Sequence, residues 1–434
     1  MPRKCSVSAT GERSRPHASM PPGADPETQA QTHDPSPGPR VPAAPNGSHP
    51  LSFLRLSGTA KKVVDWTVVI VAAGVLVTAV GAIGAGFQGA AGGRAEQLFR
   101  FAENPFVGLM IGVLATVLTQ SSTTTTSITV GLVAGGLPIQ IAIPILFGAN
   151  IGTTMTAQLV ALAMAKDKEM FRRGYAAASV HDMYNLLSVL IFFPLELAFS
   201  PLRRLSGWLA GNFAGEEAGA VGTAFQGMGA GLGVFIGPSV AMLERAVAPL
   251  GQPAAGVTLV LVGVLLILTV ITLISRMLKE LLVGRARRIF DNAIGRGAVT
   301  GVLSGALITM LVQSSTTTTS LAVPFAATGK FGLRQIFHFV VGANIGTTLT
   351  ALIAAFGFSG VEGQTALQAA LVHLLYNLMA ATLILLTPGL RALPPKGATL
   401  LSRLGTENTW YIVGWILLVF LVVPGTLILL TVLI

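Results

Sequence analysis

The sequence predicts an all-α integral membrane protein built from two inverted repeats, each carrying a re-entrant helical hairpin. Composition gives the first indication, because 52% of the 434 residues are hydrophobic and only 11% are charged, whereas soluble proteins carry about 25% charged residues. Several apolar segments also reach the roughly 20 residues that a membrane-spanning helix needs. The third indication is an internal duplication, since two polar motifs occur twice in the same order.

The duplicated motifs lie inside strongly apolar sequence and contain no charged residue. The first, Gln-Ser-Ser-Thr-Thr-Thr-Thr-Ser, occupies residues 120–127 and 313–320. The second, Gly-Ala-Asn-Ile-Gly-Thr-Thr, occupies residues 148–154 and 342–348. The copies are offset by 193 and 194 residues, and a near-constant offset indicates that a whole unit of the chain was duplicated.

Residues 1–55 are expected to form a disordered cytoplasmic tail. Eleven of the 24 prolines fall in the first 50 positions, and so polar a segment cannot bury enough apolar surface to fold. No basic stretch followed by an apolar stretch opens the chain, so we expect no cleavable signal peptide. The single cysteine, Cys5, excludes a disulfide within the chain.

The rest of the chain divides into repeat 1, a linker, repeat 2 and a C-terminal part. The expected ranges are 56–199 for repeat 1, 200–250 for an extracytoplasmic or interfacial linker, 251–390 for repeat 2, and 391–434 for a loop and a C-terminal transmembrane helix. Spans are expected at 63–87, 139–165, 175–195, 256–274, 336–358, 366–386 and 410–434. Half-length apolar segments that meet at a Gln-Ser-Ser tip predict re-entrant hairpins at 105–137 and 298–328.

Basic residues predict the orientation, because Lys and Arg mark the cytoplasmic side of membrane proteins. With the N-terminus in the cytoplasm, the basic segments 166–173, 276–296 and 391–403 fall inside if residues 225–243 do not cross. Three spans then separate the hairpins, so the hairpins enter from opposite faces, as in many secondary transporters. If residues 225–243 cross, the repeats become parallel. We expect a multi-pass protein of the plasma (cell inner) membrane, whose net charge of +10 needs no nucleic-acid partner.

A hairpin tip inside a membrane favours ion binding. The outgoing half-helix begins with free N–H groups and the positive end of its dipole, which attract an anion. The incoming half-helix ends in free carbonyls, which suit a cation. Isolated hydroxyls in membrane helices often bond a carbonyl one turn back, but a duplicated run favours binding. The expected anion ligands are Gln120, Ser121, Ser122, Thr123, Gln313, Ser314, Ser315 and Thr316.

The second motif admits two interpretations. Its Gly-xxx-Gly spacing favours close helix packing. Its asparagine and threonines place amide and hydroxyl oxygens in mid-span, which favours a helix break with ion ligands. On that interpretation the cation ligands are Asn150, Thr153, Thr154, Asn344, Thr347 and Thr348, together with the tip residues Gln120, Ser122, Gln313 and Ser315.

A third echo pairs His181 and Asn185 with His373 and Asn377. A lone helical histidine is usually a packing residue. Asp182, by contrast, is an acid within an expected span, where carboxylates are costly and tend to be functional. Its counterpart in the other repeat is a leucine, so its role must be asymmetric. We find no phosphate-binding loop of the ATPase type and no nucleophile with a base, so an enzyme is not expected.

Taken together, the motifs resemble the type II sodium-dependent phosphate cotransporters. That family carries Gln-Ser-Ser followed by Ser or Thr twice, with Gly-Ala-Asn-Ile-Gly-Thr after each, and the similarity covers residues 63–386. The resemblance implies uptake of inorganic phosphate coupled to sodium, with inverted repeats and no other metal or cofactor. It implies phosphate and sodium contacts from Gln120, Ser121, Ser122, Gln313, Ser314 and Ser315, with Thr154, Asn344 and Thr348 nearby.

The chain departs from some family members. Animal members have a longer loop between the repeats, often with a disulfide, and here that loop is short and lacks cysteine. Some bacterial relatives carry a soluble helical domain after the membrane part, and those are most readily interpreted as exporters. The sequence therefore favours sodium symport in the import direction. Alternatives are coupling to protons, export, another small oxyanion, an anion channel, or a membrane scaffold or sensor that uses the tail. The oligomeric state is left open.

Overall fold

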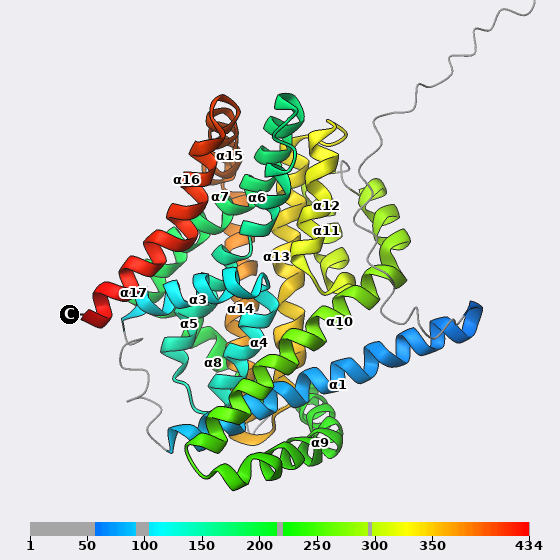
Figure 1. Cartoon of the computed structure of the whole chain (residues 1–434), viewed down its shortest axis with the longest axis vertical. Helices are drawn as coiled ribbons and strands as arrows, with labels where there is room; N and C mark the ends of the chain where they lie inside the picture. The colour runs from blue at the N-terminus through cyan, green and yellow to red at the C-terminus, as the bar shows by residue number, and fades with distance from the viewer. Residues whose placement is uncertain (1–56, 93–103, 215–219, 294–296, 434) are drawn as a thin grey trace, which may run out of the picture. The chain divides into compact units, whose positions relative to one another are not determined.

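The computed structural model describes residues 57–92, 104–214, 220–293 and 297–433, and these residues form helices joined by short turns, with no strand among them (Figure 1). The expected tail at 1–55 lies outside the described residues. The helices are α1 (Gly58–Ala91), α3 (Pro105–Thr119), α4 (Ser122–Ala134), α5 (Ile139–Gly152), α6 (Met155–Leu162), α7 (Lys168–Phe199), α8 (Pro201–Ala214), α9 (Ala220–Val247), the 3-10 helix η3 (Ala248–Leu250), α10 (Ala254–Ala293), α11 (Ala298–Val312), α12 (Ser315–Ala327), α13 (Leu333–Ala355), α14 (Gly360–Leu386), α15 (Pro388–Glu407), α16 (Thr409–Leu417), the π-helical turn η4 (Leu418–Val422) and α17 (Val423–Leu433).

The described residues contain eight helical segments long and apolar enough to cross a membrane. These segments are Gly58–Ala91, Ile139–Leu162, Lys168–Phe199, Gly233–Leu250, Ala254–Leu282, Leu333–Ala355, Gly360–Leu386 and Thr409–Thr431. Seven of them overlap the seven expected spans, which confirms an all-α, multi-pass membrane protein. The eighth, Gly233–Leu250 in α9 and η3, overlaps the segment 225–243 whose crossing the sequence leaves open. It has the lowest mean hydropathy of the eight, 1.2, and only 6% of its residues are buried.

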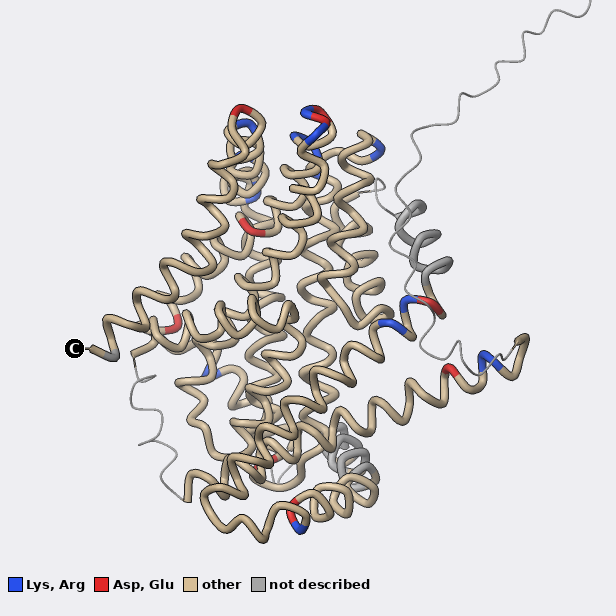
Figure 2. Tube along the Cα trace, in the orientation of Figure 1, with Lys and Arg blue, Asp and Glu red and all other residues tan. Residues whose placement is uncertain are grey.

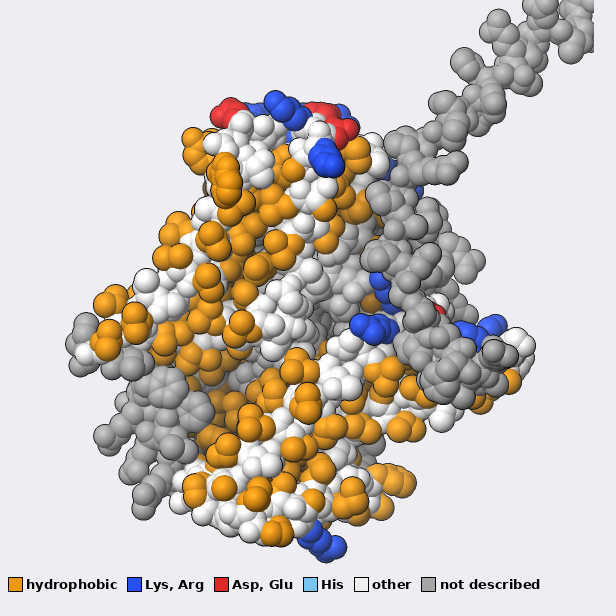
Figure 3. All heavy atoms as spheres, viewed as in Figure 1, with side chains coloured by type: hydrophobic (Ala, Val, Ile, Leu, Met, Phe, Trp, Pro, Cys, Tyr) orange, Lys and Arg blue, Asp and Glu red, His pale blue; other side chains and the backbone are white. Residues whose placement is uncertain are grey.

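The surface fits a lipid environment. Figure 3 shows hydrophobic side chains over most of the face in view, with charged side chains along its upper edge. Figure 2 shows that this upper group of charges follows the turns between α6 and α7 and between α12 and α13, together with α15. The basic residues of those segments are Lys166, Lys168, Arg172, Arg173, Lys330, Arg334, Arg391, Lys396 and Arg403.

The two longest helices, α1 and α10, lie side by side (Figure 1). Glycines allow their close approach, because a Cβ on Gly86 would lie 2.8 Å from the carbonyl oxygen of Gly256. The prediction of a loop starting at Arg276 was wrong, since α10 remains helical to Ala293. The reason is that the apolar face continues, with Met277 and Leu282 both buried. Arg296, the last basic residue of that segment, lies outside the described residues.

Each Gln-Ser-Ser motif joins two short helices. We call α3 with α4 the first helix pair and α11 with α12 the second helix pair. Within each half of the chain, α3 packs on α5 and α11 packs on α13. The outgoing helices also pack on the other half of the chain: α4 packs on α13 and α14, and α12 packs on α6 and α7. The two halves therefore interlock around the two motifs.

The C-terminal part adds structure that the sequence does not predict. Residues 391–407, expected as a loop, belong to α15, whose buried residues Pro394, Ala398, Leu401 and Gly405 recur at helical spacing against α7. The last span then widens into a π-helical turn at Leu418–Val422. Pro424 follows it, and a proline both lacks an N–H and clashes with the carbonyl one turn back, which accounts for the wider turn.

Candidate functional site

Each motif begins with a glutamine in a left-handed backbone conformation. Gln120 and Gln313 both have φ 53°, a region where a side chain is strained and glycine is usual. Their side chains explain the choice of residue. In both, Nε2 donates at 2.6 Å to a carbonyl three residues earlier, on Val117 or Met310. Each carboxamide therefore satisfies a carbonyl at the end of the incoming helix.

The glutamines also connect each Gln-Ser-Ser motif to a threonine that lies just after the second motif in the sequence. Thr156 of α6 donates its hydroxyl to Gln120 Oε1, and Thr350 of α13 donates its hydroxyl to Gln313 Oε1, both at 2.5 Å. Thr156 and Thr350 are 194 residues apart, which is the offset of the second motif. The duplication is thus repeated at the level of individual contacts.

The first serine of each motif caps the outgoing helix. Ser121 Oγ accepts the N–H of Thr124, and Ser314 Oγ accepts the N–H of Thr317, both at 3.2 Å. Serine is a favoured N-cap because its oxygen satisfies one of the N–H groups that a helix start leaves unpaired. The sequence predicts both residues as anion ligands, and their hydroxyls are engaged in capping.

A cavity of about 330 Å³ lies between the two motifs. Its lining residues are Thr119 at the end of α3, Gln120, Ser121, Ser122, Thr123 and Thr124 of the first Gln-Ser-Ser copy, Gln313, Ser314, Ser315, Thr316 and Thr317 of the other copy, and Leu268, Ile271, Thr272, Ser275, Arg276 and Lys279 of α10. All eight predicted anion ligands therefore line one cavity. Ser275 Oγ also donates to the Gln313 carbonyl at 3.3 Å, which ties α10 to the second motif.

The cavity holds hydrogen-bond donors that the chain itself does not use. Within the described residues, the hydroxyls of Ser122 and Ser315 have no hydrogen-bond partner. The backbone N–H groups of Ser122 and Thr123 in α4, and of Ser315 and Thr316 in α12, also have no partner among the described residues. Each capping serine accepts only the two N–H groups that follow these in its helix, one with its hydroxyl and one with its carbonyl. Two helix N-termini thus present matched sets of free donors to one space, and an oxyanion suits them.

The second motif does not line this cavity. Its glycines serve packing, since a Cβ on Gly152 would lie 2.7 Å from Thr116 Cβ, and one on Gly346 would lie 2.5 Å from the Ala306 oxygen. A Cβ on Gly148 or Gly342 would collide with the backbone of α3 or α11. The Gly-xxx-Gly spacing therefore lets each incoming helix rest directly on the helix of the second motif.

The asparagines of the second motif enter a buried hydrogen-bond network. Asn344 Oδ1 lies 2.6 Å from His181 Nε2, and Asn344 Nδ2 donates to Asn185 Oδ1 at 2.6 Å. Asn185 Nδ2 in turn donates to the carbonyl of Asn150 at 2.7 Å. The network joins α5, α7 and α13. The related histidine, His373, is also buried, but neither ring nitrogen has a partner among the described residues.

The threonines of the second motif differ between the copies. Thr153, Thr347 and Thr348 donate to carbonyls of their own helices. Thr154 donates both to the Ile151 carbonyl and to Asp182 Oδ1, each at 3.0 Å.

The helix break predicted in the second motif occurs only in the first copy. α5 ends at Gly152 and α6 begins at Met155, whereas α13 runs unbroken through the second copy. The carboxylate that receives Thr154 is absent from the second copy, where Leu374 stands in place of Asp182.

The sequence does not predict three residues that contact the buried Asp182 or line the cavity. The indole of Trp415 in α16 donates to Asp182 Oδ2 at 2.9 Å, so the C-terminal span completes the surroundings of this buried acid. Arg276 and Lys279 were assigned to a loop, although they line the cavity. The signal for all three is the same: a polar or charged side chain inside an apolar helix needs a partner.

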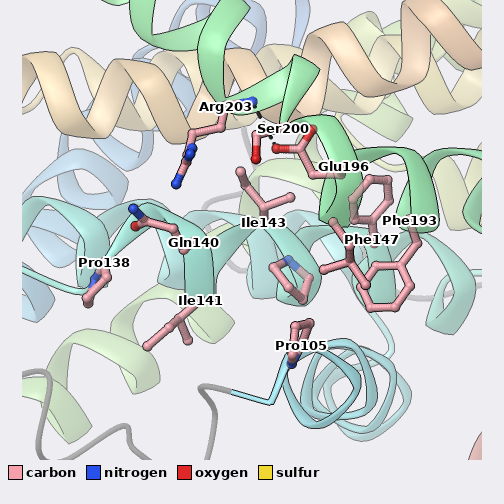
Figure 4. A pocket seen from close by; sticks show the side chains of 12 residues that line it. Pro105, Pro138, Gln140, Ile141, Ile143, Phe147, Phe193, Glu196, Ser200 and Arg203 are labelled. Carbon is pink, nitrogen blue, oxygen red and sulfur yellow. Dashed lines mark hydrogen bonds between the residues drawn. The ribbon is translucent and has the colours of Figure 1, made fainter.

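A second cavity, of about 410 Å³, lies among α3, α5, α7 and α8 (Figure 4). It is larger, but none of the predicted ligands lines it. Its acid, Glu196, is already engaged, because its two oxygens accept the N–H groups of Leu202 at 2.8 Å and Arg203 at 3.0 Å and so cap the start of α8. We therefore assign the candidate site to the cavity between the motifs.

Comparison with known proteins identifies the family of the chain. The family model described as Na+/Pi-cotransporter matches residues 61–210 and 265–390. The chain is 31% identical over 404 residues to sodium-dependent phosphate transport protein 2A of Rattus norvegicus, covering 78% of this chain and 63% of that protein. It is 30% identical over 401 residues to sodium-dependent phosphate transport protein 2B of Bos taurus, covering 74% of this chain and 58% of that protein.

The chain thus spans about 63% of the length of the rat relative. No solved structure matches it. The matched residues contain both copies of both motifs and every residue that lines the cavity between them. The chain belongs to the Na+/Pi-cotransporter family.

Proposed function

We propose that this protein imports inorganic phosphate together with sodium across the plasma membrane, and that phosphate binds between the two Gln-Ser-Ser motifs. One observation carries the proposal: both motifs, with their unused N–H groups and the hydroxyls of Ser122 and Ser315, line a single cavity. The names of the relatives, sodium-dependent phosphate transport proteins, support the choice of substrate and coupling ion.

The donor set suits a tetrahedral oxyanion. A multiply charged anion cannot leave water for apolar surroundings unless hydrogen bonds and opposite charge replace its hydration. Backbone N–H groups and hydroxyls from two directions supply the hydrogen bonds, and both helix dipoles point their positive ends at the anion. Thr123 and Thr316 stand at the same helix starts and complete the proposed phosphate ligands.

Sodium is proposed to bind beside the phosphate. Carbonyl, amide and hydroxyl oxygens are suitable ligands, and the tips bring together such oxygens from Gln120, Ser122, Gln313 and Ser315. The geometry supports the tip serines over the second motif, because the hydroxyls of Ser122 and Ser315 have no partner among the described residues. In the second motif, by contrast, the Asn344 side chain bonds Asn185, and the hydroxyls of Thr347 and Thr348 bond backbone carbonyls. Bound sodium would offset phosphate charge, and its departure would weaken phosphate binding and assist release.

Alternating access is proposed to come from two repeats of opposite orientation, with the N-terminus in the cytoplasm. The interlocked packing supports this, because α4 and α12 each rest on helices of the other half of the chain. A movement of the helix pairs against α7 and α14 would then change both sides of the cavity together.

The test is uptake of labelled phosphate by proteoliposomes that hold the purified protein. An inward sodium gradient is compared with matched potassium and proton gradients. Concentrative uptake with sodium alone is the expected result. Concentrative uptake with a proton gradient alone would mean that protons, and not sodium, are the coupling ion. Saturable binding without any concentrative uptake would contradict coupled transport.

A further inference from the structure

We propose that Arg276 and Lys279 of α10 form the fixed positive charge of the phosphate site and select a doubly charged oxyanion. This inference rests on the proposed function and deepens it. The two Gln-Ser-Ser motifs contribute only neutral side chains, so a fixed full charge beside the anion can come only from other residues of the lining. Both basic side chains line the cavity that the two motifs share.

The placement follows from helical geometry. Six residues of α10 line the cavity, and they recur at intervals of three and four from Leu268 to Lys279, which is the spacing of one face of a helix. Ser275 on this face donates to the Gln313 carbonyl, so the face is fixed against the second motif. Arg276 and Lys279 are therefore held on the side of α10 that faces the candidate site.

Neither side chain is neutralised within the described part of the chain. The ion pairs seen there are Lys61 with Asp65, and Arg172 and Arg173 with Glu169. The lining of the cavity includes no aspartate or glutamate. Two cations and two helix N-termini thus act on one space with the same sign, and this field favours an anion.

A competing explanation is that both residues reach out to the membrane surface, as long basic side chains near helix ends often do. The helix does not end there, since α10 continues for 14 residues beyond Lys279 to Ala293. Both residues also lie inside the apolar segment Ala254–Leu282, where a charged side chain that faces a polar cavity is usually functional.

The two residues suit different tasks. The planar guanidinium of Arg276 can donate two parallel hydrogen bonds to two phosphate oxygens, whereas the ammonium of Lys279 acts as a point charge. Together they offset two negative charges, which favours the dibasic form of phosphate over the monobasic form. Sodium is then needed less for neutralising the anion and more for coupling its movement.

The experiment measures phosphate KM and turnover in proteoliposomes for Arg276→Gln, Lys279→Gln and the double variant, with Arg276→Lys as the conservative change. Arg245→Gln is the matched control, because Arg245 is an exposed arginine of α9 that does not line the cavity. We expect Arg276→Gln to raise phosphate KM about tenfold or more, with partial recovery in Arg276→Lys and no change in the control. Sodium KM at saturating phosphate should stay the same.

The preference for the dibasic form gives a second readout. In wild type, phosphate KM should rise as the pH falls and the dibasic form is depleted, and the double variant should lose most of this dependence. Wild-type KM and wild-type pH dependence in the double variant would overturn the proposal.

A measurement of phosphate binding distinguishes a failure of this proposal from a failure of the proposed function. Phosphate binding to purified wild type that the double variant loses supports the basic pair even if uptake is not sodium-coupled. Equal binding by wild type and double variant overturns the basic pair while leaving transport intact, and absence of phosphate binding in wild type overturns both.

Discussion

At each motif a glutamine occupies a backbone conformation that usually belongs to glycine. A left-handed conformation costs a residue with a side chain about 1 kcal/mol or more, so the hydrogen bonds of the carboxamide must stabilise the fold by at least that amount. It does so by donating to a carbonyl of the incoming helix and by accepting a threonine hydroxyl, from Thr156 of α6 at the first motif. The two serines of a motif have different roles. At the second Gln-Ser-Ser copy, Ser314 caps the outgoing helix, whereas Ser315 lines the cavity with an unpaired hydroxyl.

The free hydroxyl predicts a direct effect on phosphate binding. Ser315→Ala removes a donor to a charged ligand, which is worth roughly 1.5–3 kcal/mol, so we expect phosphate KM in proteoliposomes to rise about tenfold or more. Thr129→Val is a suitable control, because the Thr129 hydroxyl bonds the Thr125 carbonyl within α4 and does not line the cavity. Equal KM values for Ser315→Ala and wild type would remove this serine from the site.

The strained glutamine predicts an unusual order of stabilities. Gln313→Gly and Gln313→Ala both lose the bonds to Met310 and Thr350, but only glycine relieves the left-handed backbone. We expect Gln313→Gly to be the more stable of the two by about 1 kcal/mol, measured by thermal unfolding in detergent. The reverse order would show that the conformation at Gln313 carries no strain.

At the scale of elements, close contact between helices decides where the motifs lie. The incoming helix of each pair reaches the backbone of the second-motif helix because glycines lie at the contact, as Gly305 does against the backbone of Phe339 in α13. That contact lets Thr350 reach the glutamine of the motif. The second motif therefore serves close packing in both copies and breaks the helix in the first copy, while its role as a source of ion ligands stays a prediction.

Alanine at Gly305 should disrupt this contact. Its Cβ would collide with the Phe339 carbonyl, and overpacking of this kind costs about 1–3 kcal/mol or more. We expect a clearly lower melting temperature in detergent for Gly305→Ala. Gly74→Ala in α1 is the control, because nothing lies within 4 Å of its added Cβ, and it should leave the melting temperature equal or higher. Equal melting temperatures for wild type and Gly305→Ala would contradict close packing at this point.

At the scale of the whole molecule, the duplication made much of the architecture predictable. Repeated motifs and apolar runs gave the seven spans and the eight residues that meet in one cavity. Other features depend on contacts between distant segments, which local patterns do not reveal. Examples are the bond of Trp415 to Asp182 and the approach of α10 to the motifs. The basic residues of α10 suggest a loop by their charge, but buried residues such as Met277 and Leu282 continue the apolar face of the helix between and beyond them.

The proposed inverted arrangement predicts which ends of the helices share a side of the membrane. In a Cys5→Ser background, cysteines placed at the exposed positions Lys166 and Lys396 should react with a membrane-impermeant thiol reagent from the cytoplasmic side. A cysteine at Leu250, which is 56% exposed between α9 and α10, should react from the other side. Reaction of the cysteines at 166 and 250 from the cytoplasmic side, and of the cysteine at 396 from the other side, would mean that α9 crosses and that the repeats are parallel.

The most direct test of the account is whether the two motifs build one site. Equilibrium binding of labelled phosphate to the purified protein in sodium should give one phosphate per chain. Ser122→Ala and Ser315→Ala should each weaken that same binding event, because each removes one hydroxyl from one shared cavity. Two phosphates per chain, with each variant losing only one of them, would contradict the shared site and would make each motif a separate one.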